Sequence, residues 1–227
     1  MEKTFSIIIP TLNEEMTLEF TLNSIPTSPA LEIIVVDGNS RDRTREIAYT
    51  RTSQVYISPP GRARQMNLGA QKAQGKILLF LHADSMIPAG GLEAISKALE
   101  DPHVIGGAFR LRIHAAGWGY RLIAWGANLR TRLLGLPYGD QGIFIKRKIF
   151  QEMGGFQDIP LMEDVDLIRR MKKMGSLCIL PQPMLTSARR WEKEGLLYTT
   201  LRNWSLASLY LLGVSPHRLY HWYRPVR

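Results

Sequence analysis

An α/β fold, in which helices flank a mainly parallel central sheet within a single domain, is the architecture that this sequence predicts. Three observations support it. The chain has 227 residues and 45% hydrophobic content, which is enough for one sizeable core. Short β-type runs alternate with helical stretches along the first half, as βαβ units require. The run from Ile77 to Leu81 is apolar throughout, which is typical of a strand buried on both faces.

The first half contains four expected strands and three expected helices. The strands cover residues 5–9, 32–36, 54–57 and 77–81. The helices cover residues 14–24, 42–50 and 62–74. The third helix has an apolar face whose residues recur at helical spacing, namely Ala63, Met66, Ala70 and Ala73. Its first turn is basic and polar.

The second half is less regular. Strands are expected over residues 105–111 and 142–145, and helices over 118–134, 163–174 and 194–212. The helix over 163–174 has an apolar side formed by Leu167, Ile168, Met171 and Met174. No internal repeat, low-complexity tract or linker-like stretch divides the chain, so we expect one domain.

Composition limits the class of protein and its partners. A net charge of +9 and a pI near 9.8 call for anionic partners, which are nucleic acid, acidic lipid headgroups or the phosphates of a small substrate. The single Cys178 excludes an internal disulfide and a cysteine-rich zinc site. The apolar stretch 5–10 is too short for a signal peptide, and residues 203–214 are too short to span a bilayer. We therefore expect a cytoplasmic protein.

Polar clusters follow three of the expected strands, and a fourth begins a helix. They are Pro10 to Glu14, Asp37 to Ser40, His82 to Ser85, and Glu163-Asp164. Parallel strands place their carboxyl ends along one rim, so Asp37 and Asp84 are expected to approach each other. Acids gathered on a basic protein indicate a metal ion or a hydroxyl-rich ligand. Each cluster also has a structural explanation, as a turn or as acids that complement a helix dipole.

Two phosphate-binding motifs are absent. Residues 69–76 imitate a P-loop, but five residues separate Gly69 from Gly75, and Ile77 stands where Ser or Thr must bind magnesium. No G-x-G-x-x-G follows the first expected strand. The chain is therefore neither a P-loop NTPase nor a standard dinucleotide enzyme.

Seven segments, taken in order, resemble the family 2 glycosyltransferases of Rossmann-like GT-A fold. They are SIIIPTLNE, EIIVVDGNSRDRT, GRARQMNLGAQKAQG, LLFLHADS, GDQGIFIKRKIFQEMGGF, LMEDVDLIRRM and TSARRWEKEG. The resemblance runs from about Phe5 to Gly195, which implies a glycosyltransferase domain over 1–195. The remaining tail, 196–227, is expected to be helical and either to pack on the domain or to face a membrane.

The resemblance implies a nucleotide-sugar donor, a UDP-sugar or a GDP-sugar. Four residues match the segment that holds the nucleotide, namely Pro10, Thr11, Asn13 and Glu14. Asp37 matches the acid that contacts the base or ribose. Asp84 matches the last acid of the D-x-D motif, which binds a divalent metal, Mg²⁺ or Mn²⁺. Here His82 replaces the first acid, yet magnesium takes only one or two carboxylates, so Asp84 could suffice.

The expected chemistry assigns further residues. Leaving phosphates gain negative charge, which the metal at Asp84, helped by Arg62 or Arg64, would neutralise. The attacking hydroxyl must lose a proton, and Asp164, the acid of the family's E-D motif, is the candidate base. A single displacement would invert the anomeric configuration.

Three weaker candidates complete the expected site. Arg190 and Trp191 resemble the family's arginine-tryptophan element near the acceptor and the diphosphate, where a guanidinium pairs with phosphate and an indole stacks on a sugar. Asp140, with Gln141, is a candidate for contact with the donor sugar. His217 and His221 have metal-ligand spacing but no third ligand nearby, so surface histidines are expected.

The leading hypothesis is thus an inverting transferase that moves a sugar onto a hydroxyl of a lipid or a saccharide, without nucleic acid as a partner. A nucleotidyltransferase is a second option, but the glycine-rich basic loop after its first strand is missing. The third is a basic module that binds nucleic acid or a membrane and whose catalytic site has decayed. His82 and the net charge of +9 favour this third option.

Overall fold

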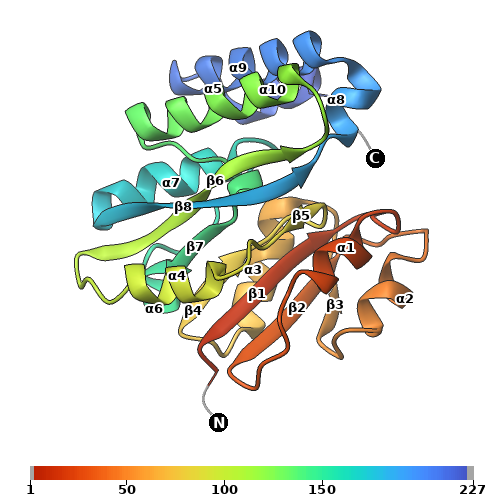
Figure 1. Cartoon of the computed structure of the whole chain (residues 1–227), viewed down its shortest axis with the longest axis vertical. Coiled ribbons are helices and arrows are strands. Elements are labelled where there is room, and N and C mark those ends of the chain that lie inside the picture. Colours follow the sequence, from red (N-terminus) through yellow and green to blue (C-terminus); the bar gives the residue numbers. More distant parts are fainter. Residues whose placement is uncertain (1–2, 224–227) are drawn as a thin grey trace.

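Eight strands form one sheet that runs through the molecule in the order β3-β2-β1-β4-β7-β6-β8-β5 (Figure 1). The computed structural model describes residues 3–223. Within them the strands are β1 (Phe5–Thr11), β2 (Leu31–Asp37), β3 (Val55–Ile57), β4 (Ile77–Phe80), β5 (Ser85–Met86), β6 (Val104–His114), β7 (Ile143–Lys146) and β8 (Ser176–Ser187). The first four pair in parallel, as do β6 and β8, whereas β7 is antiparallel to both of its neighbours. The predicted mainly parallel α/β sheet is confirmed.

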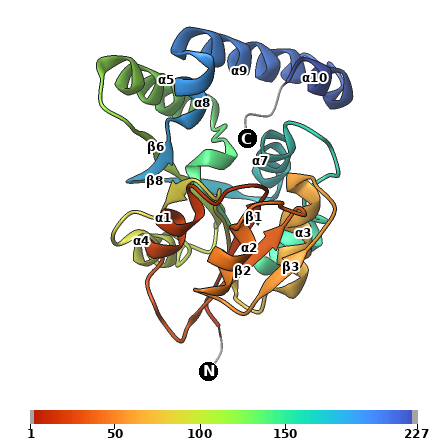
Figure 2. The same cartoon turned by 90° about the vertical axis from the view of Figure 1, so that its right-hand side faces the viewer.

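Helices cover both faces of this sheet and one end of the molecule (Figures 1 and 2). They are α1 (Leu18–Asn23), α2 (Thr44–Tyr49), α3 (Arg62–Lys72), α4 (Gly91–Ala98), α5 (Trp118–Leu134), α6 (Arg147–Glu152), α7 (Glu163–Met174), α8 (Arg189–Glu194), α9 (Leu196–Leu211) and α10 (Pro216–Trp222), with a 3₁₀ turn η1 (Gly139–Gln141). None of those in residues 3–223 is long and apolar enough to cross a bilayer.

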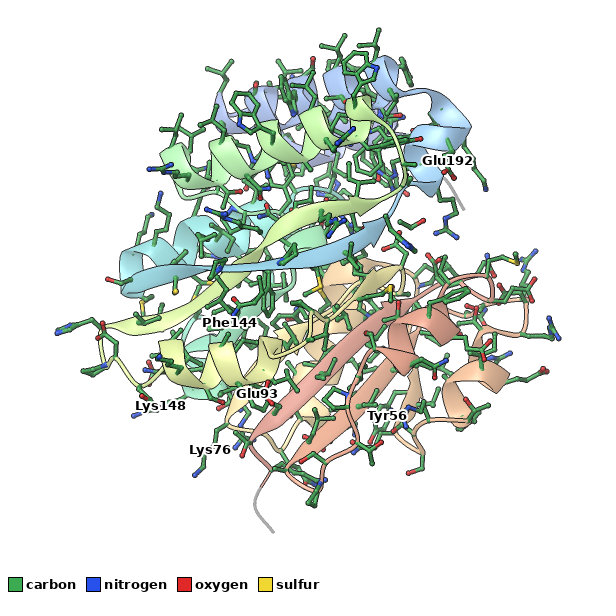
Figure 3. The ribbon with its side chains drawn as sticks, in the orientation of Figure 1. Tyr56, Lys76, Glu93, Phe144, Lys148 and Glu192 are labelled. Atoms are coloured by element: carbon green, nitrogen blue, oxygen red, sulfur yellow. The ribbon has the colours of Figure 1, made fainter. Side chains whose placement is uncertain are left out.

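Two apolar clusters fill the space between the sheet and its helices. One contains Ile7, Leu79 and Phe144, and the other, on the opposite face of the sheet, contains Ile8, Leu78 and Ile145. The alternation follows from the period of two along a strand, which sends neighbouring side chains to opposite faces. Figure 3 shows Phe144 inside the molecule, whereas Lys148, just after β7, lies at its surface. Both faces are therefore dry, which explains the uninterrupted apolar strands.

Several elements differ from the sequence prediction. The strand β8 was not predicted, because Pro181 and Pro183 interrupt its apolar run, and prolines cannot donate to a sheet. The structure accommodates them at a bulge, where the pairing with β6 shifts between Phe109 and Arg110. The helices α4 and α6 and the short strand β5 were also missed. The predicted helix 194–212 corresponds to α9. The helix α8 was not predicted, and Gly195, whose positive φ is 90°, separates it from α9.

The tail forms a helical layer with α5 at one end of the molecule (Figures 1 and 2). Leu206 of α9 and Leu219 of α10 are buried against Leu161, which precedes α7. The end of the predicted tail, residues 224–227, and residues 1–2 lie outside the described part. Within it, the tail packs on the rest of the chain through an apolar cluster.

Gly107 is required where β6 passes between β7 and β8. A Cβ atom at this position would collide with the backbone carbonyl of Cys178, which cannot swing aside as a side chain could. Gly107→Ala should therefore lower the free energy of unfolding by about 1–3 kcal/mol or more, measured by urea denaturation.

Gly126 of α5 provides the matched control. A Cβ there would lie at an ordinary distance of 3.4 Å from Trp204, so Gly126→Ala should be neutral or stabilising by about 0.5–1 kcal/mol. Equal effects of the two substitutions would contradict the packing described for β6.

Candidate functional site

Two adjoining cavities open beyond the carboxyl ends of β1 and β4. The first has a volume of about 410 Å³ and the second about 160 Å³. They share six lining residues, which are Arg62, His82, Asp84, Leu161, Arg190 and Tyr223. Pro10, Thr11, Glu14 and Arg64 line only the first cavity, and Asp140, Asp164 and Trp191 line only the second. Most of the predicted site residues thus surround one hollow.

Asp37 lies beneath this hollow and is not part of either cavity wall. It is fully buried, and its carboxylate accepts hydrogen bonds from the Thr11 hydroxyl at 3.1 Å and the Ser40 amide N–H at 2.8 Å. These bonds tie the end of β2 to the end of β1. Asp37 thereby fixes Thr11, the last residue of β1, which does line the first cavity.

The loop after β1 is held by bonds to the loop after β2. Asn13 has a positive φ of 53°, a conformation that Asn tolerates better than most residues. Its backbone N–H donates to Ser40 Oγ at 2.8 Å, and its Oδ1 accepts from the Arg41 N–H at 2.9 Å. Asn13 does not line either cavity, so in this structure it shapes the loop.

Glu14 connects this loop to the C-terminal part of the chain. Arg189 Nη2 of α8 donates to Glu14 Oε2 at 2.7 Å, and both side chains are largely buried. Burial raises the pKa of Glu14, and the nearby Asp84 adds to that effect, whereas Arg189 opposes it. The pair joins residues 175 positions apart, and both of them line the first cavity.

The two arginines of α3 have different surroundings. Arg62 Nε lies 2.6 Å from Glu163 Oε1, and Glu163 is almost completely buried. Burial raises the pKa of Glu163 although Arg62 opposes the shift. Arg64 pairs with Asp158 at 2.9 Å, and both of these side chains are more than half exposed. Arg62 is therefore the better anchored cation of the site, because it is fixed to the first residue of α7.

The side chains of His82 and Asp164 both lie close to the Cα atom of Gly139. A Cβ at Gly139 would lie 2.7 Å from His82 Nε2 and 3.3 Å from Asp164 Oδ2, so only glycine leaves room for both. The Gly139 N–H donates to Asp164 Oδ2 at 2.7 Å, and the Val165 N–H donates to Oδ1 at 2.8 Å. These bonds fix the orientation of the Asp164 carboxylate at the wall of the second cavity.

His82 is a neutral imidazole at pH 7. Burial lowers its pKa to about 4, and the positive charge of Arg62 adds to this effect more than Asp84 opposes it. The residue that replaces the first acid of the D-x-D motif therefore brings no charge of its own. It does keep a nitrogen lone pair that can accept a hydrogen bond or bind a metal.

Asp140 has the most perturbed carboxyl group of the cavity. The residue is partly exposed, but its Oδ1 atom is buried without a hydrogen-bond partner among the described residues. Burial raises its pKa to about 6, Arg130 opposes the shift, and Asp164 and Asp84 add to it. An unpaired acid beside two others is a place where a ligand hydroxyl or a cation would be favourable.

Gln141 is placed differently from what the sequence suggests. It is fully buried, its Nε2 donates to the Phe109 carbonyl at 2.8 Å, and its Oε1 accepts from Thr131 at 3.0 Å. These bonds hold η1 against β6 and α5. Gln141 therefore positions its neighbour Asp140 and does not face the cavity itself.

The tail supplies residues that sequence reasoning missed. Tyr223 lines both cavities. Its hydroxyl accepts a hydrogen bond from the Arg190 guanidinium, whose Cζ atom lies 5.0 Å from the centre of the Tyr223 ring. Asn203 lines the second cavity. The predicted Trp191 of α8 lines the second cavity too, and its Nε1 donates to Thr200 of the tail at 3.3 Å. The aromatic richness of the tail was visible in the sequence, but its return over the cavity was not.

The two tail histidines are exposed, as expected from their sequence positions. His217 lies at the wall of the first cavity, whereas His221 lines neither cavity. They are not joined by a third ligand, since no group of three His, Cys, Asp or Glu in residues 3–223 could hold a metal ion.

Comparison with known proteins places the chain in a family. The model of the family described as "Glycosyl transferase family 2" matches residues 6–154. The chain therefore belongs to glycosyl transferase family 2. A curated relative, the probable glycosyltransferase YdaM of Bacillus subtilis, is 27% identical over 222 residues, which cover 83% of this chain and 50% of YdaM. The chain spans about half to two thirds of the length of the first such relatives.

Solved structures share the fold. Residues 1–349 of TarS from S. aureus, in complex with UDP-GlcNAc, match with a TM-score of 0.63 and 16% identity over 81% of this chain and 58% of that one. The mannosyltransferase PcManGT of Pyrobaculum calidifontis, in complex with GDP-Man and Mn²⁺, matches with a TM-score of 0.59 and 21% identity over 82% and 57%. At this identity the likeness concerns the fold.

The pKa of Asp140 makes the stability of the fold depend on pH. Its folded value of about 6 lies above the usual 3.8, so the folded state binds the proton more tightly than the unfolded state does. Ionised Asp140 therefore lowers the free energy of unfolding. The loss is complete above about pH 6 and disappears as the pH falls below about 4.

Asp140→Asn removes that penalty. The variant should be more stable than the wild type by about 1–3 kcal/mol at about pH 8, and the gain should vanish at about pH 4. Urea denaturation at the two pH values measures the difference. A gain that is the same at both values, or a loss at the higher one, would show that the carboxylate is not strained.

Proposed function

We propose that this protein is an inverting glycosyltransferase that moves a sugar from a nucleoside-diphosphate sugar to an acceptor hydroxyl. The observation that carries the proposal is that Asp84, Asp164 and Arg62, which come from distant parts of the chain, line one pair of joined cavities. The membership in glycosyl transferase family 2 gives the reaction class. The joined cavities support the assignment of this reaction to one site.

The first cavity suits the nucleotide part of the donor. Its wall contains Pro10 and Thr11 and four arginines, among them Arg62 and Arg64. Guanidinium groups pair with phosphate oxygens, and the larger volume leaves room for a base and a ribose. TarS binds UDP-GlcNAc and PcManGT binds GDP-Man, so uridine and guanosine diphosphate sugars are both reasonable donors to test.

A divalent metal, Mg²⁺ or Mn²⁺, belongs to the proposal, and the residues present fit one. Asp84 lines both cavities beside the neutral His82. Mg²⁺ takes one or two carboxylates and completes its shell with phosphate oxygens and water, so Asp84 with the donor diphosphate would form an adequate site. When bound, the metal would neutralise charge that develops on the leaving phosphates. The structure of PcManGT was solved with Mn²⁺.

Asp164 is the proposed general base. The backbone N–H groups of Gly139 and Val165 hold its carboxylate at the wall of the second cavity, and each oxygen keeps a further lone pair. An acceptor hydroxyl in this cavity can give its proton to Asp164 as its oxygen bonds to the anomeric carbon and the bond to the diphosphate breaks. One base and one displacement invert the anomeric configuration.

The second cavity suits the transferred sugar and the acceptor. Trp191 and Tyr138 supply ring faces of the kind that stack on sugars, and Asp140 supplies an unpaired acceptor for a hydroxyl. The acceptor is a hydroxyl of a lipid or of a saccharide. Nucleic acid is disfavoured, because three carboxylates in this wall would repel a phosphate backbone.

Replacement of the proposed base tests the mechanism. Asp164→Asn keeps the shape of the side chain but cannot take a proton, so the transfer rate should fall by at least about a hundredfold. Binding of the nucleotide-sugar, measured by isothermal titration calorimetry, should change little. Asp166→Asn is the matched control on the same helix, because Asp166 pairs with Arg170 at 2.7 Å and should leave transfer nearly unchanged. Normal turnover by Asp164→Asn would remove Asp164 from the role.

Replacement of the proposed metal ligand tests the donor site. Wild-type protein should bind UDP or GDP about tenfold more tightly with Mn²⁺ than with a chelator present, because a cation held by Asp84 would attract the negative charge of the diphosphate. Asp84→Asn should bind the nucleotide with the same affinity in both conditions. A variant that keeps the full response to Mn²⁺ would show that the metal is held elsewhere.

A further inference from the structure

The helix α5 carries an apolar stripe that faces away from the core. Trp118, Leu122, Trp125, Leu129 and Leu133 follow one another at intervals of three or four residues, so they lie on one side of the helix. Trp118 is 76% exposed, Trp125 62% and Leu133 70%. The opposite side of the helix is buried through Ala124, Ala127 and Thr131. The side of α5 that carries small residues packs against the rest of the protein, and the side that carries large apolar residues is exposed to solvent.

The helix α9 repeats this arrangement next to α5. Leu197, Leu201, Trp204 and Leu211 recur at helical spacing and are exposed, while Thr199, Leu206 and Ala207 are buried. The two helices touch where glycines of α5 meet α9: a Cβ at Gly126 would lie 3.4 Å from Trp204, and one at Gly119 would lie 3.1 Å from Leu196. Figures 1 and 2 show both helices in the layer at one end of the molecule. We call the exposed apolar residues of these two stripes the α5–α9 surface. They are Trp118, Leu122, Trp125, Leu129 and Leu133 of α5 and Leu197, Leu201, Trp204 and Leu211 of α9.

The segments that contain α5, α9 and α10 carry no acidic residue. Residues 102–139 and 195–227 include neither Asp nor Glu, so all 20 carboxylate side chains belong to the other segments. Arg121 and Arg132 are exposed on α5 beside its stripe, and Arg218 is exposed on α10. Glu194 of α8 does reach α9, but it is paired with Arg202 at 2.7 Å. An apolar surface whose own helices carry only positive charge is complementary to an apolar phase that carries negative charge at its boundary.

The tryptophans point to the same environment. Four of the five in the chain, Trp118, Trp125, Trp204 and Trp222, lie in α5, α9 and α10, and each is 48–76% exposed. Indole side chains combine an apolar ring with an N–H donor, and they concentrate where hydrocarbon meets headgroups. In water, by contrast, so many exposed tryptophans would only promote aggregation.

We infer that the α5–α9 surface docks on the surface of an anionic lipid bilayer. A second copy of this chain is a poorer occupant, because a symmetric contact would bring two arginine-bearing surfaces together, and α5, α9 and α10 offer no carboxylate to pair with them. The apolar stripes sink into the headgroup region, while Arg121 and Arg132 contact lipid phosphates.

Docking in this way places the second cavity beside the bilayer. Asn203 of α9 lines that cavity, and Arg130 of α5 stacks at 3.4 Å over the ring of Tyr138, which lines it too. The acceptor hydroxyl would then be carried by a membrane-embedded molecule. This consequence rests on the proposed function, whereas membrane docking itself does not.

Vesicle co-sedimentation tests the docking without any measurement of activity. Wild-type protein should bind vesicles of phosphatidylcholine and phosphatidylglycerol at least about tenfold more tightly than vesicles of phosphatidylcholine alone, and added salt should weaken the binding. The triple variant Leu122→Ser, Trp125→Ser, Leu201→Ser should bind the anionic vesicles at least about tenfold less well. All three side chains are more than half exposed, so the urea midpoint should stay the same or rise.

A second variant controls for the loss of exposed apolar side chains in general. Phe20 and Tyr49 are 65% and 60% exposed, and the helices that carry them, α1 and α2, lie away from α5 and α9 (Figure 1). Phe20→Ser, Tyr49→Ser should bind vesicles as the wild type does. Three results would overturn the inference: no binding of wild type to anionic vesicles, equal losses in both variants, or a wild-type dimer in sedimentation velocity that only the triple variant dissociates.

Discussion

The antiparallel pairing of β4 with β7 is the constraint on which the site depends. Phe80 at the end of β4 is opposite Ile143 at the start of β7. His82 and Asp84, which follow β4, must therefore lie beside Gly139 to Gln141, which precede β7. The gap at Gly139 admits His82 from one side and Asp164 from the other. One strand pair thus joins the parallel half of the sheet, with its nucleotide-side loops, to the half that carries the proposed base.

The pairing of β4 with β7 also determines which charged side chains line the cavities. Asp84, Asp140 and Asp164 come together in one wall, and the raised pKa of Asp140 reflects their mutual repulsion in addition to burial. Arg62 is fixed by Glu163, and Arg190 is held by Tyr223 from the tail. A cavity lined by these carboxylates and by arginine side chains suits a ligand that contains both a metal ion and a diphosphate.

Much of this arrangement was predictable from the sequence, and the reasons for the exceptions are physical. The apolar runs of β1, β2 and β4 and the polar residues after them fixed the sheet and the rim, because parallel strands end together. The strand β8 was hidden by Pro181 and Pro183, which are tolerated only at its bulge. The sequence predicts Asp37 at the rim of the sheet beside the ligand. In the structure its carboxylate is buried, accepts hydrogen bonds from the hydroxyls of Thr11 and Ser40, and lines neither cavity. The position of Tyr223 depends on tertiary packing through Leu219, which no local pattern encodes.

A crystal structure of the protein with Mn²⁺ and a nucleoside diphosphate tests the central claim most directly. The account predicts the metal bound to an Asp84 oxygen at about 2.0–2.6 Å, the diphosphate between it and Arg62, and the base beside Thr11 in the first cavity. A nucleotide bound outside the two cavities, or a metal and diphosphate that leave Asp84 without a ligand contact, would contradict it.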